Sequence, residues 1–336
     1  AREVAVADGA HALLGTRVVS TGGLTKTGPG RLTLSASTAI AGSVVISAGT
    51  FALGNGGATG SVEGTVRVDA GGALAINRNN RVALTTPITG GGSFVQMGSG
   101  STVMTVANSY SGATGVQAGV LRVEHASALA SSPTTVSGGR IDVADGLVAE
   151  IAGLSVAGGV VEINAGGLSI AAGGITSDSL VAALGAGRGD GSWTGASGIR
   201  SSAAASFVAA GESREVGWVE RPDGSFFVAV AAPGDANVDG AVDILDVSNF
   251  LVSGKFDTGL PAVWEDGDFG FDGLVDILDA AAFISMGLFD AGFYNPSSFS
   301  AVGVASVPEP TTLGLAGILV LGGVVAARRH RRKETH

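Results

Sequence analysis

Two short acidic segments hold the residues best suited to chemistry. Residues 234–246 read GDANVDGAVDILD, and residues 267–279 read GDFGFDGLVDILD after a constant shift of 33 positions. A calcium loop of twelve residues supplies hard oxygens from positions 1, 3, 5, 7, 9 and 12 and has glycine at position 6. The first segment places at these positions Asp235, Asn237, Asp239, Ala241 through its carbonyl, Asp243 and Asp246. The second places there Asp268, Asp272, Leu274 through its carbonyl, Asp276 and Asp279.

The two loops differ at position 3, where Gly270 has no side-chain oxygen to match Asn237. We therefore expect two Ca²⁺ ions, of which the second is held more weakly. Twelve acidic residues lie between Asp235 and Asp290, and Lys255 is the only base among them. Their mutual repulsion predicts that this small domain folds only with a divalent cation. Val242, at position 8, is apolar and predicts a contact between the paired loops.

An apolar segment follows each loop and predicts a short amphipathic helix. Residues 244–254 read ILDVSNFLVSG and residues 277–287 read ILDAAAFISMG. This duplicated loop–helix pair resembles the type I dockerin domain, with EF-hand-type calcium loops, over residues 233–293. The resemblance implies that calcium folds the module and that a helix face docks on a cohesin.

Loop positions 10 and 11, which help to choose the partner in that family, hold two apolar pairs. These candidate docking residues are Ile244, Leu245, Ile277 and Leu278. Three interpretations follow: the loops serve folding alone, the pairs dock a partner, or the pairs pack on each other or on the rest of the protein.

The acidic module follows a long segment of alternating apolar and polar residues, broken by glycine turns. Glycine makes up 56 of the 336 residues, and turn glycines recur at an irregular step in the low twenties. This pattern predicts stacked coils of short strands, a right-handed parallel β-helix (β-solenoid) over residues 1–205. A β-sandwich is the alternative, although it has no reason to repeat its turns at this step. The fold class is therefore mainly β, followed by the small α-helical module.

Residues 22–55 and 91–123 resemble the autotransporter-associated β-strand repeat. The first contains GGLTKTGPGRLTLS, and a shift of 70 residues aligns it with GSFVQMGSGSTVMT. The resemblance implies a β-helix on an exported bacterial protein. Acidic residues before residue 210 are sparse and show no paired-carboxylate motif. We therefore expect no enzymatic activity and interpret these acids as solvated surface charge.

Residues 176–232 predict a short helix, then loops, and finally a capping hairpin within residues 206–232. Asp223-Gly224 lies between two alternating runs, which is a strong hairpin signal. We expect Trp218 and Phe226 or Phe227 to cover the end of the coils. The absence of cysteine excludes disulfides and thiol chemistry, and the net charge of -10 disfavours nucleic-acid binding.

The C-terminus has three parts after a linker at 294–306. Pro308, Glu309 and Pro310 precede 17 uncharged residues at 311–327, and a basic block beginning with Arg328 and Arg329 follows. The span is long enough, at ~26 Å, to cross a bilayer as a transmembrane helix; a buried core helix is the alternative. Residues 307–336 resemble the PEP-CTERM sorting signal, which implies recognition by an exosortase-type membrane protease.

The preferred interpretation is an exported structural or adhesive protein at the cell envelope, outer surface or outside the cell. The C-terminal helix is its transient or permanent membrane anchor. The alternative is a carbohydrate-active or polysaccharide-binding component that a cohesin-like partner recruits to a scaffold.

Overall fold

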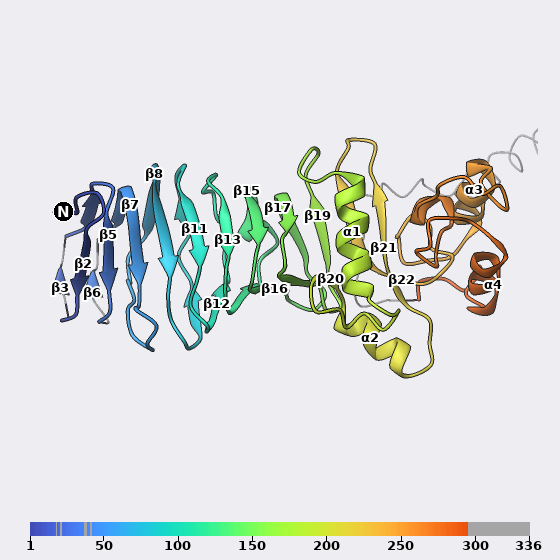
Figure 1. Cartoon of the computed structure of the whole chain (residues 1–336), viewed down its shortest axis with the longest axis horizontal. Coiled ribbons are helices and arrows are strands. Elements are labelled where there is room, and N and C mark those ends of the chain that lie inside the picture. Colours follow the sequence, from blue (N-terminus) through green and yellow to red (C-terminus); the bar gives the residue numbers. More distant parts are fainter. Residues whose placement is uncertain (18, 21, 37–38, 41, 295–336) are drawn as a thin grey trace, which may run out of the picture. The chain divides into compact units, whose positions relative to one another are not determined.

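The computed structural model describes residues 1–294 apart from residues 18, 21, 37, 38 and 41. Its strands form a solenoid of about eight turns in which successive coils stack along the chain (Figure 1). Fourteen strands form the largest sheet: β1 (Arg2–Ala5), β2 (His11–Leu14), β4 (Leu24–Thr27), β5 (Arg31–Leu34), β7 (Val44–Leu53), β8 (Val66–Ile76), β10 (Ile88–Thr89), β11 (Ser93–Gln96), β13 (Thr114–Val116), β15 (Leu129–Val136), β17 (Val148–Val156), β19 (Gly167–Ile170), β21 (Glu215–Glu220) and β22 (Phe226–Ala231).

A second sheet closes the other side of the coils. Its six strands are β9 (Val82–Leu84), β12 (Ser101–Met104), β14 (Val120–Val123), β16 (Arg140–Val143), β18 (Val160–Glu162) and β20 (Gly198–Arg200). A third, two-stranded sheet pairs β3 (Val19–Ser20) with β6 (Ala39–Ile40). The helices are η1 (Ala126–Ala128), α1 (Ser177–Arg188), α2 (Ser202–Ala209), α3 (Ile244–Ser253), η2 (Trp264–Asp266) and α4 (Ile277–Ser285).

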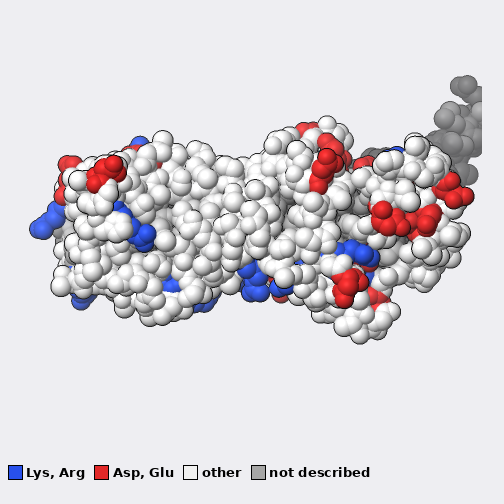
Figure 2. Space-filling model, in the orientation of Figure 1, with Lys and Arg blue, Asp and Glu red and all other residues white. Residues whose placement is uncertain are grey.

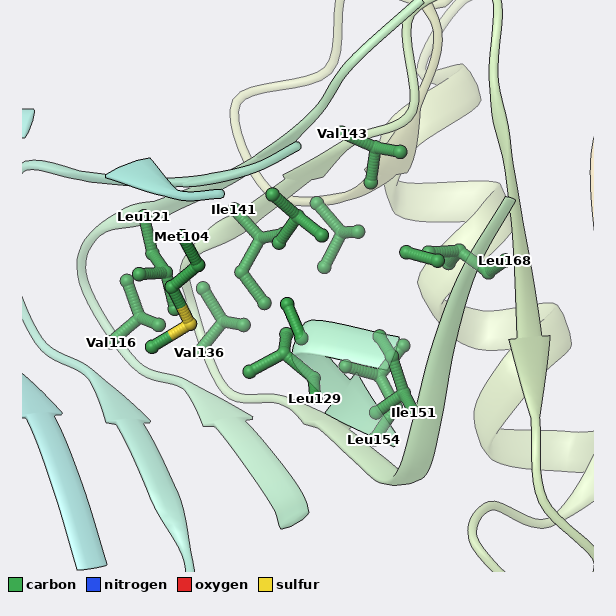
Figure 3. Packing of buried hydrophobic residues seen from close by; sticks show 14 of the residues in the cluster. Met104, Val116, Leu121, Leu129, Val136, Ile141, Val143, Ile151, Leu154 and Leu168 are labelled. Atoms are coloured by element: carbon green, nitrogen blue, oxygen red, sulfur yellow. The ribbon is translucent and has the colours of Figure 1, made fainter. Parts of the chain in front are cut away.

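The coils stack because each interior position repeats about 20 residues later. Leu32 pairs with Phe51, Phe51 with Leu74, and Leu74 with Phe94, and all four side chains are buried. Farther along, Leu121 and Ile141 of one sheet face Val136 of the other across the interior (Figure 3). Every ladder from β1 to β20 is parallel, which confirms the solenoid and excludes a β-sandwich of antiparallel sheets.

Glycine is required at the corners because neighbouring coils touch there. A Cβ on Gly30 would lie 2.1 Å from the carbonyl oxygen of Ala7, and a Cβ on Gly100 would lie 2.3 Å from that of Asn80. No side chain fits at these distances. The spacing of corner glycines therefore records the spacing of the coils.

The last coil ends in a cap formed by α1, α2 and the hairpin β21–β22. Strand β22 pairs antiparallel with β19, so it ends the parallel stacking. Trp218, Phe226 and Phe227 are buried, as predicted. Helix α1 confirms the predicted short helix, whereas α2 was expected to be a loop. Ser201 caps α2 by accepting from the Ala204 N–H at 3.0 Å.

Figure 2 shows a face of the solenoid that is largely free of charge at its middle. No helix within the described residues is long and apolar enough to cross a membrane. The predicted span at 311–327 lies outside those residues, as do Pro308, Glu309, Pro310, Arg328 and Arg329.

Candidate metal centre

The two acidic loops share one backbone conformation. Val238 and Phe271, at position 4, have φ of 56° and 58°, and Gly240 and Gly273, at position 6, have φ of 89° and 84°. Left-handed backbone is uncommon for residues with side chains, and for a β-branched valine it is strained. The surrounding contacts must therefore hold both loops in this shape.

In the first loop, the carboxylates of positions 1 and 12 organise the backbone. Asp235 accepts hydrogen bonds from the N–H groups of Asp239 and Gly240, each at 3.0 Å. Asp246 accepts from those of Ala236 at 2.9 Å and Asn237 at 3.2 Å. These bonds draw both ends of the loop around its polar centre.

The second loop repeats these bonds 33 residues later. Asp268 accepts from the N–H groups of Asp272 at 3.1 Å and Gly273 at 2.9 Å. Asp279 accepts from those of Phe269 and Gly270, both at 2.9 Å. The carboxylates of positions 1 and 12 thus organise the backbone of each loop separately.

Each loop also starts the helix that follows it, as predicted. Asp243 is the N-cap of α3 and Asp276 is that of α4, accepting from the N–H groups of Leu245 and Leu278 at 2.7 Å. The carboxylate at position 12 bonds back to the N–H at position 9, which completes a capping box. Positions 9 and 12 therefore serve the loop and the helix together.

The two halves of the module pack across each other. A Cβ on Gly234, before the first loop, would meet the ring of Phe283 on α4 at 2.3 Å. A Cβ on Gly267, before the second loop, would meet the ring of Phe250 on α3 at 2.4 Å. Each helix thus packs on the entrance of the other loop.

The predicted contact between the loops at Val242 stays a prediction, because the backbone partner of Val242 lies in another segment. Val242 forms a bridge with Phe289, and its carbonyl oxygen accepts from the Asp290 N–H at 2.9 Å. The corresponding Val275 accepts from the Asp257 N–H at 2.9 Å. Position 8 therefore pairs with the segment after the opposite helix, because the crossed helices bring that segment to the loop.

Burial makes these carboxylates difficult to charge. Burial, with neighbouring carboxylates adding to it, raises the pKa of Asp235 to about 8 and those of Asp246 and Asp268 to about 6. It also raises the pKa of Asp279. The one lysine of the module, Lys255, bonds Asp266 at 2.6 Å instead of a loop ligand. A cation inside the loops would supply the missing positive charge.

The donors of the first loop fit a hard cation in type and number. The described residues contain no group of three or more His, Cys, Asp or Glu side chains already converged on one point. The four aspartates of the first loop therefore do not meet at one point in this structure, and the predicted set also includes the Asn237 amide and the Ala241 carbonyl. Calcium accepts this mixture of oxygens in a flexible cage. The second loop lacks the oxygen donor at position 3, because Gly270 has no side chain.

The apolar pairs at positions 10 and 11 are exposed. Ile244 and Leu245 are 66% and 59% exposed, and Ile277 and Leu278 are 69% and 70% exposed. The interpretation that they pack on each other or on the solenoid is therefore wrong, because the N-terminal turns of α3 and α4 point them outward. The module also has an apolar cavity of about 350 Å³, lined by Val247, Phe283, Ile284, Gly287 and Phe289.

Contacts between the module and the cap involve residues that the sequence did not single out. Phe271 of the second loop lies 5.7 Å from the ring of Trp193 and 5.5 Å from the guanidinium of Arg188. Tyr294, predicted to begin the linker, instead donates to Asp235. The sequence offered one signal for the role of Tyr294: it is an aromatic residue at the start of a predicted linker that is rich in small residues.

Comparisons with known protein families match two segments of the solenoid and one segment near the C-terminus. Residues 24–53 and 94–123 match the passenger-associated-transport-repeat model, and residues 306–332 match the PEP-CTERM protein-sorting motif. The chain carries passenger-associated transport repeats and a PEP-CTERM motif. Both predictions from the sequence are confirmed. No curated protein and no solved structure matches the chain. Neither match includes residues 233–293, so the comparisons do not support a dockerin-like domain there.

Each passenger-associated transport repeat has a buried polar side chain that donates hydrogen bonds to backbone carbonyl oxygens at its glycine corner. In the first repeat, the Lys26 ammonium donates to the carbonyl oxygens of Gly28 at 2.7 Å and Ala48 at 3.0 Å. In the second repeat, the Gln96 amide donates to those of Gly98 at 2.8 Å and Gly100 at 3.3 Å. Lys26 and Gln96 are related by the 70-residue shift. Both repeats therefore have a hydrogen-bond donor at this corner, which is charged in the first repeat and neutral in the second.

The repeats and the PEP-CTERM motif together indicate an exported protein of the envelope or surface. The motif implies anchoring there and processing by an exosortase.

Proposed function

We propose that this exported protein is a non-enzymatic structural or adhesive component whose C-terminal module is folded by calcium and docks a protein partner. The observation that carries the proposal is the repetition of ligand spacing, backbone conformation and backbone hydrogen bonds in the two loops, apart from position 3. A folding role alone explains the buried carboxylates, whereas docking explains the exposed apolar pairs.

The first ion would be held by Asp235, Asn237, Asp239, Ala241, Asp243 and Asp246. The second would be held by Asp268, Asp272, Leu274, Asp276 and Asp279. Calcium, when bound, would balance the buried negative charge and draw the loop ligands together.

The docking face is aliphatic, which favours a protein surface over a polysaccharide. It comprises the exposed pairs of α3 and α4, and Ile284 of α4 is also 72% exposed. A cohesin-like partner is one candidate by resemblance. Sugars are commonly bound by aromatic platforms and polar groups, which this face lacks at its centre.

The charges of the solenoid support a non-enzymatic role. Asp142 accepts from Arg122 at 2.9 Å and from Arg140 at 3.0 Å, and Glu162 accepts from Arg200 at 2.9 Å. Acids neutralised by arginines are poor general bases or nucleophiles. Glu162 is also buried, which corrects the expectation that all these acids are solvated.

The tail completes the proposal. Pro308, Glu309 and Pro310 would be recognised by the exosortase-type protease. Residues 311–327 would span the membrane before processing, with Arg328 and Arg329 on the cytoplasmic side.

Calcium titration of the full chain by calorimetry tests the proposal. We expect two binding events, the tighter at the first loop. The absence of binding heat at millimolar Ca²⁺ would refute the calcium-folded module.

A capture experiment tests the docking face separately. We expect the full chain with calcium to retain a partner from an envelope extract, and the variant with serine at Ile244, Leu245, Ile277 and Leu278 to lose it. Leu13→Ser is the control, because Leu13 is similarly exposed, at 60%, on the solenoid. Equal capture by both variants would remove this face from the proposal.

A further inference from the structure

Tyr294, the last described residue, binds the first loop with both its side chain and its backbone. Its hydroxyl donates to Oδ2 of Asp235 and accepts from the N–H of Ala232 at 3.0 Å. Its own N–H donates to the carbonyl oxygen of Gly240 at 3.0 Å. Tyr294 thus contacts loop positions 1 and 6 together.

These bonds leave one oxygen of Asp235 better placed to bind an ion. Each carboxylate oxygen has two lone pairs. Oδ2 accepts from Gly240 and Tyr294, whereas Oδ1 accepts from Asp239 alone. The remaining lone pair of Asp235 therefore belongs to Oδ1. Tyr294 fixes which oxygen turns toward the ion.

In the second loop no tyrosine hydroxyl of the described residues bonds to the carboxylate at position 1. Ala262 donates its N–H to the Gly273 carbonyl at 2.8 Å, in the place that Tyr294 takes against Gly240. A methyl group cannot donate to Asp268, whose Oδ2 accepts from the Gly273 N–H. The two position-1 carboxylates thus differ by one tyrosine hydroxyl.

The other side of the tyrosine ring is held by the cap. The guanidinium of Arg214 lies 5.1 Å from the ring centroid of Tyr294 and 5.1 Å from that of Phe207 on α2. Arg214 is buried, and its Nε makes no hydrogen bond within the described residues. The guanidinium is thus fixed by stacking between the two rings, as in other cation–π pairs, and by the bond from its Nη1 to the carbonyl oxygen of Ser213 at 2.8 Å.

We propose that Tyr294 is a positioning residue for the ion of the first loop and that the ion, in return, fastens the start of the C-terminal tail to the cap. The inference rests on the proposed calcium function. Binding linkage makes the effect reciprocal: a tyrosine that strengthens ion binding is itself held more firmly when the ion is bound.

The test is calcium titration of the full chain with Tyr294→Phe, combined with hydrogen exchange of residues 289–294. Outer-sphere partners of metal ligands typically change affinity by about 10–100-fold. We expect the first site to weaken about tenfold and the second to keep its affinity. In the wild type, calcium should slow amide exchange at Asp290 and Tyr294, and the variant should lose most of this protection.

Tyr110→Phe is the matched control, because Tyr110 is the only other tyrosine and its hydroxyl bonds Thr114 inside the solenoid. It should leave both sites and the exchange of residues 289–294 unchanged. A second variant, Arg214→Met, keeps the tyrosine hydroxyl and should release the segment with a smaller loss of affinity.

The outcomes separate this inference from the proposed function. Two wild-type calcium sites with the first unaltered in Tyr294→Phe would overturn the positioning role alone. An equal loss of calcium affinity at both sites in Tyr294→Phe would also overturn it. So would a similar loss of affinity in the control Tyr110→Phe. A wild type that binds no calcium would overturn both proposals.

Discussion

The first and second acidic loops have the same backbone but different surroundings. Asp235 is completely buried and bonded to Tyr294, whereas Asp268 is slightly exposed and has no tyrosine beside it. The first loop has Asn237 where the second has Gly270. The loop conformation thus follows from the repeated spacing, while the strength of each site depends on contacts from distant parts of the chain.

Removing the metal should have the largest effect and should act on both loops. We expect EDTA to unfold residues 233–293, because the buried carboxylates then lose their compensating charge, while the solenoid remains folded. Hydrogen exchange should accelerate in α3 and α4 and stay slow in β11–β17. Trp264 fluorescence should change, since its indole is buried and bonded to the Asp235 carbonyl at 2.8 Å. Unaltered exchange in α3 and α4 would contradict the prediction.

Alanine at position 12 should break one loop at a time. Asp246→Ala and Asp279→Ala each remove a ligand and three backbone bonds, so each should weaken its own site by more than the ~100-fold upper range for outer-sphere partners. Calorimetry should then report one remaining site in each variant. The Asp246 variant should also be the less stable, because Asp246 supports the loop to which the Tyr294 hydroxyl and the Trp264 indole are bonded. The reverse order would refute the asymmetry.

A side chain at position 3 should make the second loop more like the first. A Cβ on Gly270 would lie 3.4 Å from Oδ1 of Asp279, an ordinary contact distance. We therefore expect Gly270→Asn to fold and to strengthen the second site roughly three- to tenfold, or about 0.7–1.4 kcal/mol. Asn237→Gly is the reciprocal variant and should weaken the first site. No change in either variant would show that position 3 contributes nothing.

The smallest effect concerns the cap side of the second loop. Glu215 bonds Arg188 at 3.1 Å and the Trp193 indole at 2.7 Å, and both partners contact Phe271. Burial raises the pKa of Glu215 above its ordinary value, although Arg188 and Trp193 oppose the shift. The folded state therefore binds its proton more tightly than the unfolded state does.

The contribution of Glu215 to stability is consequently present below its unfolded pKa and is lost as the pH rises through the folded value. Melting curves from pH 4 to 7, at constant calcium, should show a shallower fall for Glu215→Gln than for the wild type. Equal slopes would mean that Glu215 does not contribute to this dependence.

The features of the structure that depend on residues near each other in the chain could be predicted from the sequence. Alternation and corner glycines predicted the solenoid because each coil repeats the same packing problem every 20 or so residues. The apolar segments after the loops predicted α3 and α4, and the structure adds that positions 9 and 12 cap those helices. The contacts of Arg214 with Tyr294, and of Trp193 with Phe271, could not be predicted. Such pairs join segments 78–80 residues apart and follow no period.

The antiparallel strand β22 has a consequence for how such proteins can vary in length. Among the parallel strands of the largest sheet it pairs with the last one, β19, so the hairpin and the module beyond it attach to that coil whatever the number of coils before it. Insertion or deletion of one 20-residue coil upstream would shift the module by about 4.8 Å, the spacing of neighbouring strands. Recombination between repeats could therefore adjust how far the N-terminal end of the solenoid lies from the module without redesigning the module.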